Sequence, residues 1–197
     1  ITNTNSVTWS ANNPYYQPSG SLTFPNSNSY LSGTSASMAF GTGDFCVEAW
    51  VLASNIAGMP SGGIFITGYG GFGLLGINTL AQIQASHFGF SNILLADIGL
   101  TQNQWTHVCF TRVSAACRIF YNGVLRGYLA SNTTNFATTG SDVGGGTDGS
   151  QHWIGNISNL RVTAGGIPSA YSTSATTVGT TVFSPPTRPL APVANTK

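Results

Sequence analysis

The sequence contains very few charged residues. Only 6% of its 197 residues are Asp, Glu, Lys or Arg, whereas soluble domains typically contain about 25%. The six basic residues are scattered, so the chain lacks the basic run that neutralises phosphates, and we expect no nucleic-acid binding. Disorder is a poor explanation for the missing charge, because 41% of the residues are hydrophobic and the net charge is only +1. Such a neutral surface favours a protein that is packed into an assembly or exposed outside a cell.

The sequence also lacks long apolar runs and helical periodicity. No apolar stretch approaches the ~20 residues that cross a bilayer, so we expect no membrane span. Apolar residues nowhere recur at i, i+3, i+4 and i+7 for more than about one turn, which predicts almost no helix. No signal peptide is visible, and the chain begins at Ile1 rather than Met, so we expect a processed N-terminus or a part of a longer protein.

Cysteine is scarce, and its three copies cannot all pair within one chain. A turn at 113–116 would place Arg112 opposite Cys117 and turn Cys109 to the other face, so a Cys109–Cys117 bridge is not expected. Cys46 and Cys109 can pair if their strands are neighbours. The alternative is that all three cysteines are small buried apolar residues. Zinc is not expected, because the chain has no CxxC and no paired histidine spacing.

Carboxylates are also scarce, which bears on glycoside hydrolysis. That reaction usually needs two carboxylates roughly 5–10 Å apart, and Glu48 is the only glutamate. Asp44 and Glu48 can share a strand face, but four residues at ~3.3 Å each separate their Cα atoms by ~13 Å. Histidine and serine are present without a G-x-S-x-G elbow, and we interpret His107 as a structural histidine. We therefore expect no catalytic residues and no enzymatic activity.

Strand patterns are strongest in two places. Residues 105–128 read as a β-meander, with Ser-Ala-Ala at one turn and Asn122-Gly123, a dipeptide suited to a type I′ turn, at the next. Phe45 to Ala53 alternates, so one face is expected to point into the core and the other to be partly covered or to form a shallow binding surface. The core face comprises Phe45, Val47, Ala49 and Val51, and the other face comprises Cys46, Glu48, Trp50 and Leu52. Trp9 alternates with Val7, which predicts a short strand near residues 6–10.

Four segments in order carry a resemblance to a known family. They are SLTFPNSNSYL (21–31), GDFCVEAWV (43–51), the W-x-H-V-x-F-x-R and I-F-Y-N-G-V-L pair within 105–125, and WIGNISNLRV (153–162). Together they resemble laminin-G-like, concanavalin-A-like jelly-roll domains, which implies an all-β, two-sheet antiparallel β-sandwich. Tyr171 and residues 183–197 resemble the tail that versions of this domain carry in tailed-phage virion proteins.

The resemblance and composition divide the chain into three parts. Residues 1–20 are expected to form an N-terminal arm or edge segment, and residues 21–165 the jelly-roll sandwich. Residues 166–197 are Gly/Ser/Thr-rich and then Pro-rich, and prolines favour an extended, solvated path. The two terminal parts are expected to provide attachment to other molecules.

The function implied by the resemblance is that of a non-enzymatic surface or structural protein of a tailed-phage virion. It would be a capsid decoration or a tail or fibre component, exposed on the virion surface or outside cells. Its expected partners are other virion proteins, further copies of itself with a trimer as one option, and host surface glycan. The alternative is a secreted or cell-surface lectin module that binds carbohydrate, since this fold serves many functions.

Candidate ligand-binding residues cluster where a loop meets the last strong strand. They are Asp148, Gln151, His152 and Trp153, an aromatic with amide and carboxylate groups as a sugar site requires. Trp50 and Tyr69 are further candidates, and for each aromatic the alternative is core or interface packing. No cofactor is expected. Asp142 and Asp148 are candidate Ca²⁺ ligands, but a simple turn with Asp148-Gly149 at its tip is the favoured interpretation.

Overall fold

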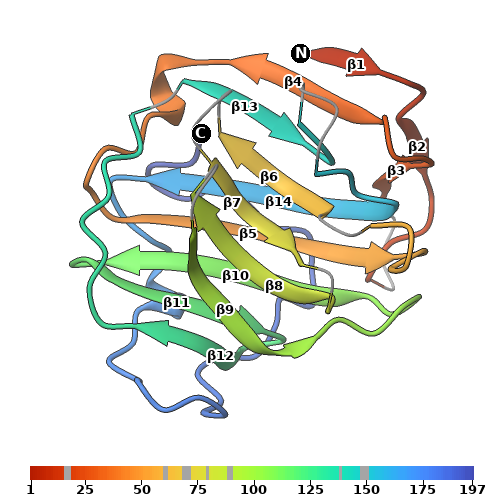
Figure 1. The fold of residues 1–197 in the computed structure, drawn as a ribbon. Helices are drawn as coiled ribbons and strands as arrows, with labels where there is room; N and C mark the ends of the chain where they lie inside the picture. Colours follow the sequence, from red (N-terminus) through yellow and green to blue (C-terminus); the bar gives the residue numbers. More distant parts are fainter. Residues whose placement is uncertain are drawn as a thin grey trace.

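The computed structural model describes residues 1–15, 19–59, 62–67, 72–78, 80–87, 91–137, 139–146 and 151–197. Two seven-stranded antiparallel sheets lie face to face (Figure 1). Sheet A has the order β1-β4-β13-β6-β7-β8-β9, and sheet B has the order β12-β11-β10-β5-β14-β3-β2. This confirms the predicted β-sandwich. The near absence of helix is also confirmed, because the described residues contain only two three-residue 3₁₀ turns besides strands.

The strands are β1 (Thr2–Thr4), β2 (Thr8–Ser10), β3 (Ser21–Phe24), β4 (Tyr30–Thr34), β5 (Phe45–Ala53), β6 (Gly62–Thr67), β7 (Phe72–Ile77), β8 (Gln82–His87), β9 (Ser91–Gly99), β10 (Thr106–Val113), β11 (Ala116–Tyr121), β12 (Val124–Leu129), β13 (Gly140–Val143) and β14 (Gly155–Ala164). The 3₁₀ turns are η1 (Ala36–Met38) and η2 (Ser169–Tyr171). No helix in the described part of the chain is long and apolar enough to cross a membrane.

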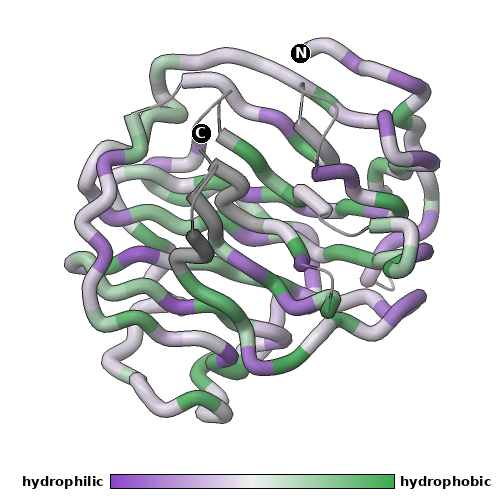
Figure 2. The backbone as a smooth tube through the Cα atoms, in the orientation of Figure 1, coloured by the Kyte–Doolittle hydropathy of each residue, from purple (hydrophilic) through white to green (hydrophobic). Residues whose placement is uncertain are grey.

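Strand β5 shows how alternation builds the core. Phe45, Val47, Ala49 and Val51 are fully buried between the sheets, as predicted from their shared face. Each large apolar side chain buried in this way contributes about 1.5–3 kcal/mol. Figure 2 shows long pale stretches between the green and purple ones, in keeping with a chain in which only 6% of the residues are charged. The inward alternation of a few strands therefore determines how the two sheets face each other.

A buried arginine joins the core to two loops. Arg112 is fully buried on β10, and its guanidinium lies 4.4 Å from the centre of the Phe136 ring. The guanidinium donates hydrogen bonds of 2.7–2.9 Å to the carbonyl oxygens of Gly41, Gly43 and Thr134. Carbonyl dipoles thus satisfy this buried cation, which would otherwise carry a large desolvation cost.

The central meander forms as the turn residues predict. Asn122 and Gly123 both have positive φ angles, of 46° and 80°, at the β11–β12 turn. Arg112 lies opposite Cys117, so Cys117 faces the main core and Cys109 faces the outer side of sheet B. Cys46 and Cys109 lie on neighbouring strands with their Sγ atoms 3.5 Å apart, and both are free thiols.

The N-terminal segment contributes an edge strand to each sheet. β1 pairs with β4 at one edge of sheet A, and β2 pairs with β3 at the matching edge of sheet B. Between them Asn5 and Ser6 have positive φ angles, which let the chain cross from one sheet to the other. An attachment role for this segment stays a prediction.

The C-terminal segment forms a third layer over the outer face of sheet B. It is largely irregular, as its composition predicts, but it is not free of the sandwich. Tyr171 is buried, and the Phe183 ring lies 4.4 Å from the Tyr171 ring and 5.2 Å from the Phe120 ring. The backbone is also fixed, because Val182 donates to the Gly123 carbonyl and the Phe183 carbonyl occupies the space where a side chain on residue 123 would lie. We call residues 166–197 the strap.

Truncating the strap's main aromatic should destabilise the whole domain. We expect Phe183→Ala to lower the free energy of unfolding by about 2 kcal/mol, less than the 3–5 kcal/mol typical of a fully buried Phe, because Phe183 is half-buried. Urea unfolding monitored by tryptophan fluorescence measures this change. Val178→Ala in the same segment is the control, since Val178 is exposed and its loss should cost less than about 0.5 kcal/mol. Equal effects of the two changes would contradict the packing role of the strap.

Candidate functional site

The predicted ligand cluster at residues 148–153 is only partly available for binding. Asp148 lies outside the described residues. Gln151 and His152 are half-buried, and Trp153 is fully buried within the main core. The structure therefore differs from the expectation at Trp153: its ring packs between the sheets and presents no face to solvent. The first residues after the loop already follow the inward alternation of the sandwich.

The candidate metal ligands are likewise not assembled in the described residues. Asp142 is buried on β13, and Asp148, its proposed partner, lies outside the described part of the chain. Among the described residues no group of three or more His, Cys, Asp or Glu side chains could hold a metal ion. Ca²⁺ binding at this loop stays a prediction.

The other candidate aromatics also differ from a free platform. Tyr69 lies outside the described residues. Trp50 is half-buried on the outer face of sheet B, where the Tyr15 ring meets it edge-on with centroids 6.0 Å apart. The His107 ring lies 5.5 Å from Trp50 on its other side. Trp50 is thus part of a packed aromatic cluster rather than a solvent-exposed surface.

The outer face of sheet B contains a buried charge cluster beneath the strap. The Glu48 carboxylate is fully buried, and the Arg161 Nε and Nη2 atoms lie 2.7 and 2.5 Å from its Oε1 atom. Tyr171 donates its hydroxyl to Oε2 at 2.5 Å, and the His107 Nε2 atom lies 3.0 Å from the same oxygen. Four donor atoms from β10, β14 and the strap thus surround one carboxylate on β5.

Hydrogen bonding indicates which histidine tautomer occupies this cluster. The His107 Nδ1 atom is buried and has no hydrogen-bond partner in the described part of the chain, while Nε2 faces the Glu48 carboxylate. A proton on Nε2 is donated to the carboxylate, whereas a proton on Nδ1 would be buried without an acceptor. The neutral Nε2–H form therefore fits the site, and Arg161 supplies the balancing positive charge. This arrangement stabilises the strap. While the strap is in place, a substrate cannot reach the Glu48 carboxylate.

Burial and charge shift the pKa values in this cluster. Burial, reinforced by the negative charge of Glu48 and the hydrogen bond to it, raises the pKa of Tyr171 well above its ordinary value. Burial also raises the pKa values of the Cys46 and Cys109 thiols, so neither thiol readily ionises to the thiolate. For Arg161, burial alone would lower the pKa, but the Glu48 carboxylate raises it above the ordinary value. The guanidinium and phenol therefore both keep their protons at neutral pH.

Removing the Tyr171 hydroxyl should change both stability and its pH dependence. We expect Tyr171→Phe to lower the free energy of unfolding at pH 7 by about 1.5–3 kcal/mol, because a buried charge-assisted hydrogen bond is lost. Above about pH 10 the unfolded Tyr171 ionises while the folded one stays protonated, so stability falls as pH rises.

The Tyr171→Phe variant lacks that ionisation. Above pH 10 its free energy of unfolding should therefore fall less steeply than that of the wild type, and the two slopes should differ by up to about 1.4 kcal/mol per pH unit. Urea unfolding at pH 7, 9, 10 and 11 measures both effects. Tyr30→Phe, outside the cluster, is the matched control. Parallel pH profiles for wild type and Tyr171→Phe would contradict the proposed coupling between Tyr171 and Glu48.

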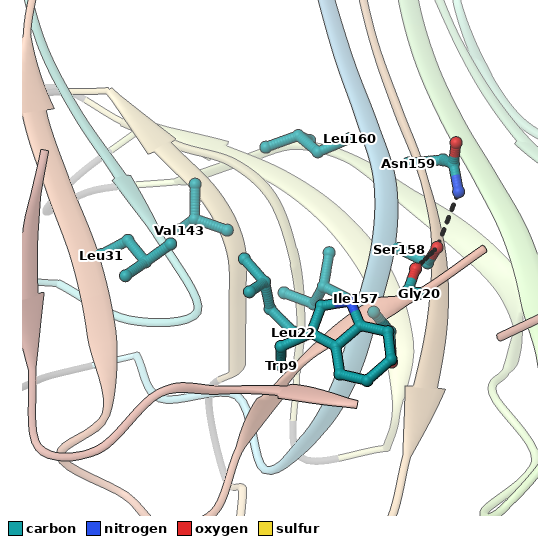
Figure 3. Close-up of a pocket in the computed structure, with 10 residues that line it drawn as sticks. Trp9, Gly20, Leu22, Leu31, Val143, Ile157, Ser158, Asn159 and Leu160 are labelled. Carbon is teal, nitrogen blue, oxygen red and sulfur yellow. Dashed lines mark hydrogen bonds between the residues drawn. The ribbon is translucent and has the colours of Figure 1, made fainter. Parts of the chain in front are cut away.

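A groove opens at the sandwich edge formed by the N-terminal strands. On sheet B, Trp9, Leu22 and Ile157 are directly paired across β2, β3 and β14, so their side chains share the inner face. Leu31 and Val143, paired across β4 and β13, face them from sheet A. Figure 3 shows these two walls with the Trp9 ring at the mouth of the gap between them. The groove has a volume of about 350 Å³.

Trp9 is the aromatic residue among the described residues that line this groove. It is 70% exposed, although its cross-strand partner Leu22 is half-buried and Ile157, the next residue along this row, is buried. The indole packs so closely on the backbone of Gly20 that a Cβ atom at position 20 would clash with the Trp9 Nε1 atom. Glycine at position 20 therefore leaves room for the ring against the backbone. Together with the aliphatic side chains of the groove, Trp9 forms a contiguous apolar surface, and such a surface, where it is exposed, marks a binding site.

Polar groups line one side of the groove. The Ser158 hydroxyl donates to the Gly20 carbonyl at 2.6 Å and accepts from the Asn159 amide at 2.7 Å. The Asn159 side-chain oxygen accepts from the backbone N–H of Leu190 in the strap, 3.1 Å away. The dashed line in Figure 3 marks the Ser158–Asn159 contact. Asn159 has a positive φ of 52°, so a strained backbone presents this amide at the rim.

A second hollow, of about 440 Å³, lies between Arg161, the η2 turn and Val193–Ala194. Arg161 is already bound to Glu48 and to the carbonyl oxygen of Ala191. This hollow has no aromatic side chain among its described lining residues, whereas the groove presents Trp9, so the groove is the better candidate site. The sequence pattern indicated a strand at Trp9 but not a site, because the groove's walls come from five strands that only the fold brings together.

The greater part of the chain matches one protein family. Residues 22–165 match the model of the concanavalin A-like lectin/glucanases superfamily, so the chain belongs to this family. The laminin-G-like, concanavalin-A-like resemblance of the sequence is thereby confirmed. No curated protein matches the chain.

Several solved structures share the fold at low sequence identity. Domain 4 of AbnA, a GH43 extracellular arabinanase from Geobacillus stearothermophilus solved with arabinotriose, is 13% identical over 80% of this chain and 75% of its own, with a TM-score of 0.60. A SAP-like pentraxin from Limulus polyphemus is 17% identical over 72% and 74%, with a TM-score of 0.54. A candidate carbohydrate binding protein from Bacteroides ovatus is 19% identical, with a TM-score of 0.51; the match covers 68% of this chain and 40% of that protein.

Proposed function

We propose that this protein is a non-enzymatic carbohydrate-binding domain that holds a glycan in the groove beside Trp9. The observation that carries the proposal is the 70% exposed Trp9 ring, fixed over Gly20 at the mouth of a groove. The family assignment supports it, because the family is that of lectins and glucanases. Two solved neighbours add support, since one is described as a carbohydrate binding protein and the other was solved with arabinotriose.

The chemistry of the groove suits a sugar ring. One face of a pyranose is covered with C–H groups, which pack against an aromatic ring, while its hydroxyls bind polar groups at the rim. Trp9 offers the ring, and the amide of Asn159 together with the Gly20 carbonyl offers rim contacts. The volume of about 350 Å³ falls at the lower end of the range of about 300–1,000 Å³ for small-ligand pockets, so one or two sugar units would fill it.

Replacement of Trp9 should remove glycan binding without unfolding the domain. We expect Trp9→Ala to weaken binding by about 10- to 100-fold, the loss expected when about 1.5–3 kcal/mol of ring burial disappears, and Trp9→Phe to keep part of it. Screening on a glycan array followed by calorimetric titration measures the effect. Leu80→Ala, another exposed apolar side chain, is the control. Undiminished binding by Trp9→Ala would contradict the proposed site, and absence of binding by wild type would contradict the function.

A virion location is a second, finer proposal. It is supported by the resemblance of residues 153–197 to tails of phage virion proteins and by the 6% content of charged residues. The strap packs onto its own sheet, so it is less suited to contact other subunits. The N-terminal edge strands β1 and β2 are the better candidates, because edge strands carry unpaired backbone groups. Under this proposal the domain is exposed on the virion surface and binds host glycan there.

The two proposals differ in the assembly state that they require. A virion structural protein should form a stable trimer or larger assembly whether or not sugar is present, whereas a free lectin module should be a monomer that binds polysaccharide. Light scattering of the purified chain, alone and mixed with glycans, measures the molar mass in both states. A glycan-binding monomer would count against the virion proposal and leave the carbohydrate-binding proposal intact.

A further inference from the structure

We infer that the sugar unit recognised at the Trp9 groove is uncharged and inserts a methyl group, as a 6-deoxyhexose or an N-acetylated hexosamine can. This inference rests on the proposed function and specifies its ligand. Three features of the groove indicate which chemical group enters the gap between the two sheets. They are the uncharged lining, the two facing aliphatic walls and the hydrogen bonds already present at the rim.

Charge is the first argument. None of the described residues that line the groove carries a charge. Arg161, close along the chain to the lining residue Leu160, directs its guanidinium to Glu48 and to the Ala191 carbonyl. A uronic or sialic acid carboxylate in the groove would therefore lose water without gaining a counter-charge, which is unfavourable. A neutral sugar avoids this loss.

The shape and chemistry of the walls are the second argument. Behind Trp9 the groove lies between Leu22 and Ile157 on one sheet and Leu31 and Val143 on the other (Figure 3). All four side chains are aliphatic, so a hydroxyl placed between them would be buried with no hydrogen-bond partner on either wall. A methyl group in the same place would gain contacts with both walls. The inner end of the groove thus favours the methyl-bearing edge of a sugar.

The rim supplies the third argument, because its polar groups are already largely paired. The Ser21 hydroxyl donates to the Asn12 carbonyl and accepts from Asn156. The Ser158 hydroxyl donates to Gly20 and accepts from Asn159. Few hydrogen-bonding positions remain for a ligand, chiefly the second amide hydrogen of Asn159 and the second lone pair of the Gly20 carbonyl oxygen. The sugar's hydroxyls would therefore point outward to water and to Asn159, with its apolar edge pointing inward.

The test uses pairs of neutral sugars that differ by one group, titrated into the full chain. Methyl glycosides of D-fucose and D-galactose differ only at C6, and those of N-acetylglucosamine and glucose differ only at C2. Saturation-transfer NMR identifies which ligand protons contact the protein, and chemical-shift titration measures affinity. We expect a preference of about fourfold for the methyl-bearing member of at least one pair, the gain from burying one such group. The pair that shows it distinguishes the two sources of the methyl.

A matched pair of protein variants tests the location. Val143→Thr places a hydroxyl on the groove wall with almost no change of shape and should abolish the methyl preference, whereas Val178→Thr in the exposed part of the strap should retain it. Equal affinities within both pairs, with binding still lost in Trp9→Ala, would overturn this inference and leave the proposed function standing. Preference for a glucuronide would overturn it in the same way. Binding unaffected by Trp9→Ala would overturn both.

Discussion

The buried carboxylate of Glu48 is the constraint on which the outer face of sheet B depends. A carboxylate without partners in this position would cost several kcal/mol, so its four donor contacts are a condition of folding rather than an addition to it. The donors come from Arg161 on β14, His107 on β10 and Tyr171 in the strap. An apolar side chain at position 48 would need no such partners, whereas the buried carboxylate needs its donors in place, and one of them is the Tyr171 hydroxyl of the strap. The carboxylate thereby favours the arrangement of the C-terminal residues in which Tyr171 lies over β5.

The strands that carry strong local signals were predictable from the sequence. The alternation in Phe45–Ala53 and the turn at Asn122-Gly123 each depend on a few neighbouring residues. Both are therefore present in the structure as predicted. The alternation also indicated that the face with Glu48 would be partly covered or would form a shallow binding surface, and the structure shows that it is covered. What covers this face was not predictable. The Pro-rich composition of residues 183–197 indicates only an extended backbone path, whereas the anchoring of the strap depends on contacts of the Phe183 ring with His107 and Phe120, more than sixty positions away.

The candidate site was less predictable, for a geometric reason. At a junction between a loop and a strand, a shift of one residue moves a side chain from one face of the sheet to the other. The sequence around Trp153 is consistent with either outcome, and the fold turns this ring inward. Trp9 shows the opposite case, since its inner-facing position in β2 would be buried in a central strand. It is exposed because β2 is the last strand of sheet B, at the edge where the two sheets diverge.

The strap also has a consequence for synthesis of the chain. Glu48 and Tyr171 are separated by 123 residues, and Arg161 by 113, so the ribosome releases the carboxylate long before two of its partners exist. β14 lies between β5 and β3, so Arg161 joins the carboxylate when sheet B itself is completed, and Tyr171 joins it only when the strap docks. Until the strap is in place, Cys46, Cys109 and Phe120 form an uncovered apolar surface on the outer face of sheet B, and apolar surface exposed in this way favours association with other chains.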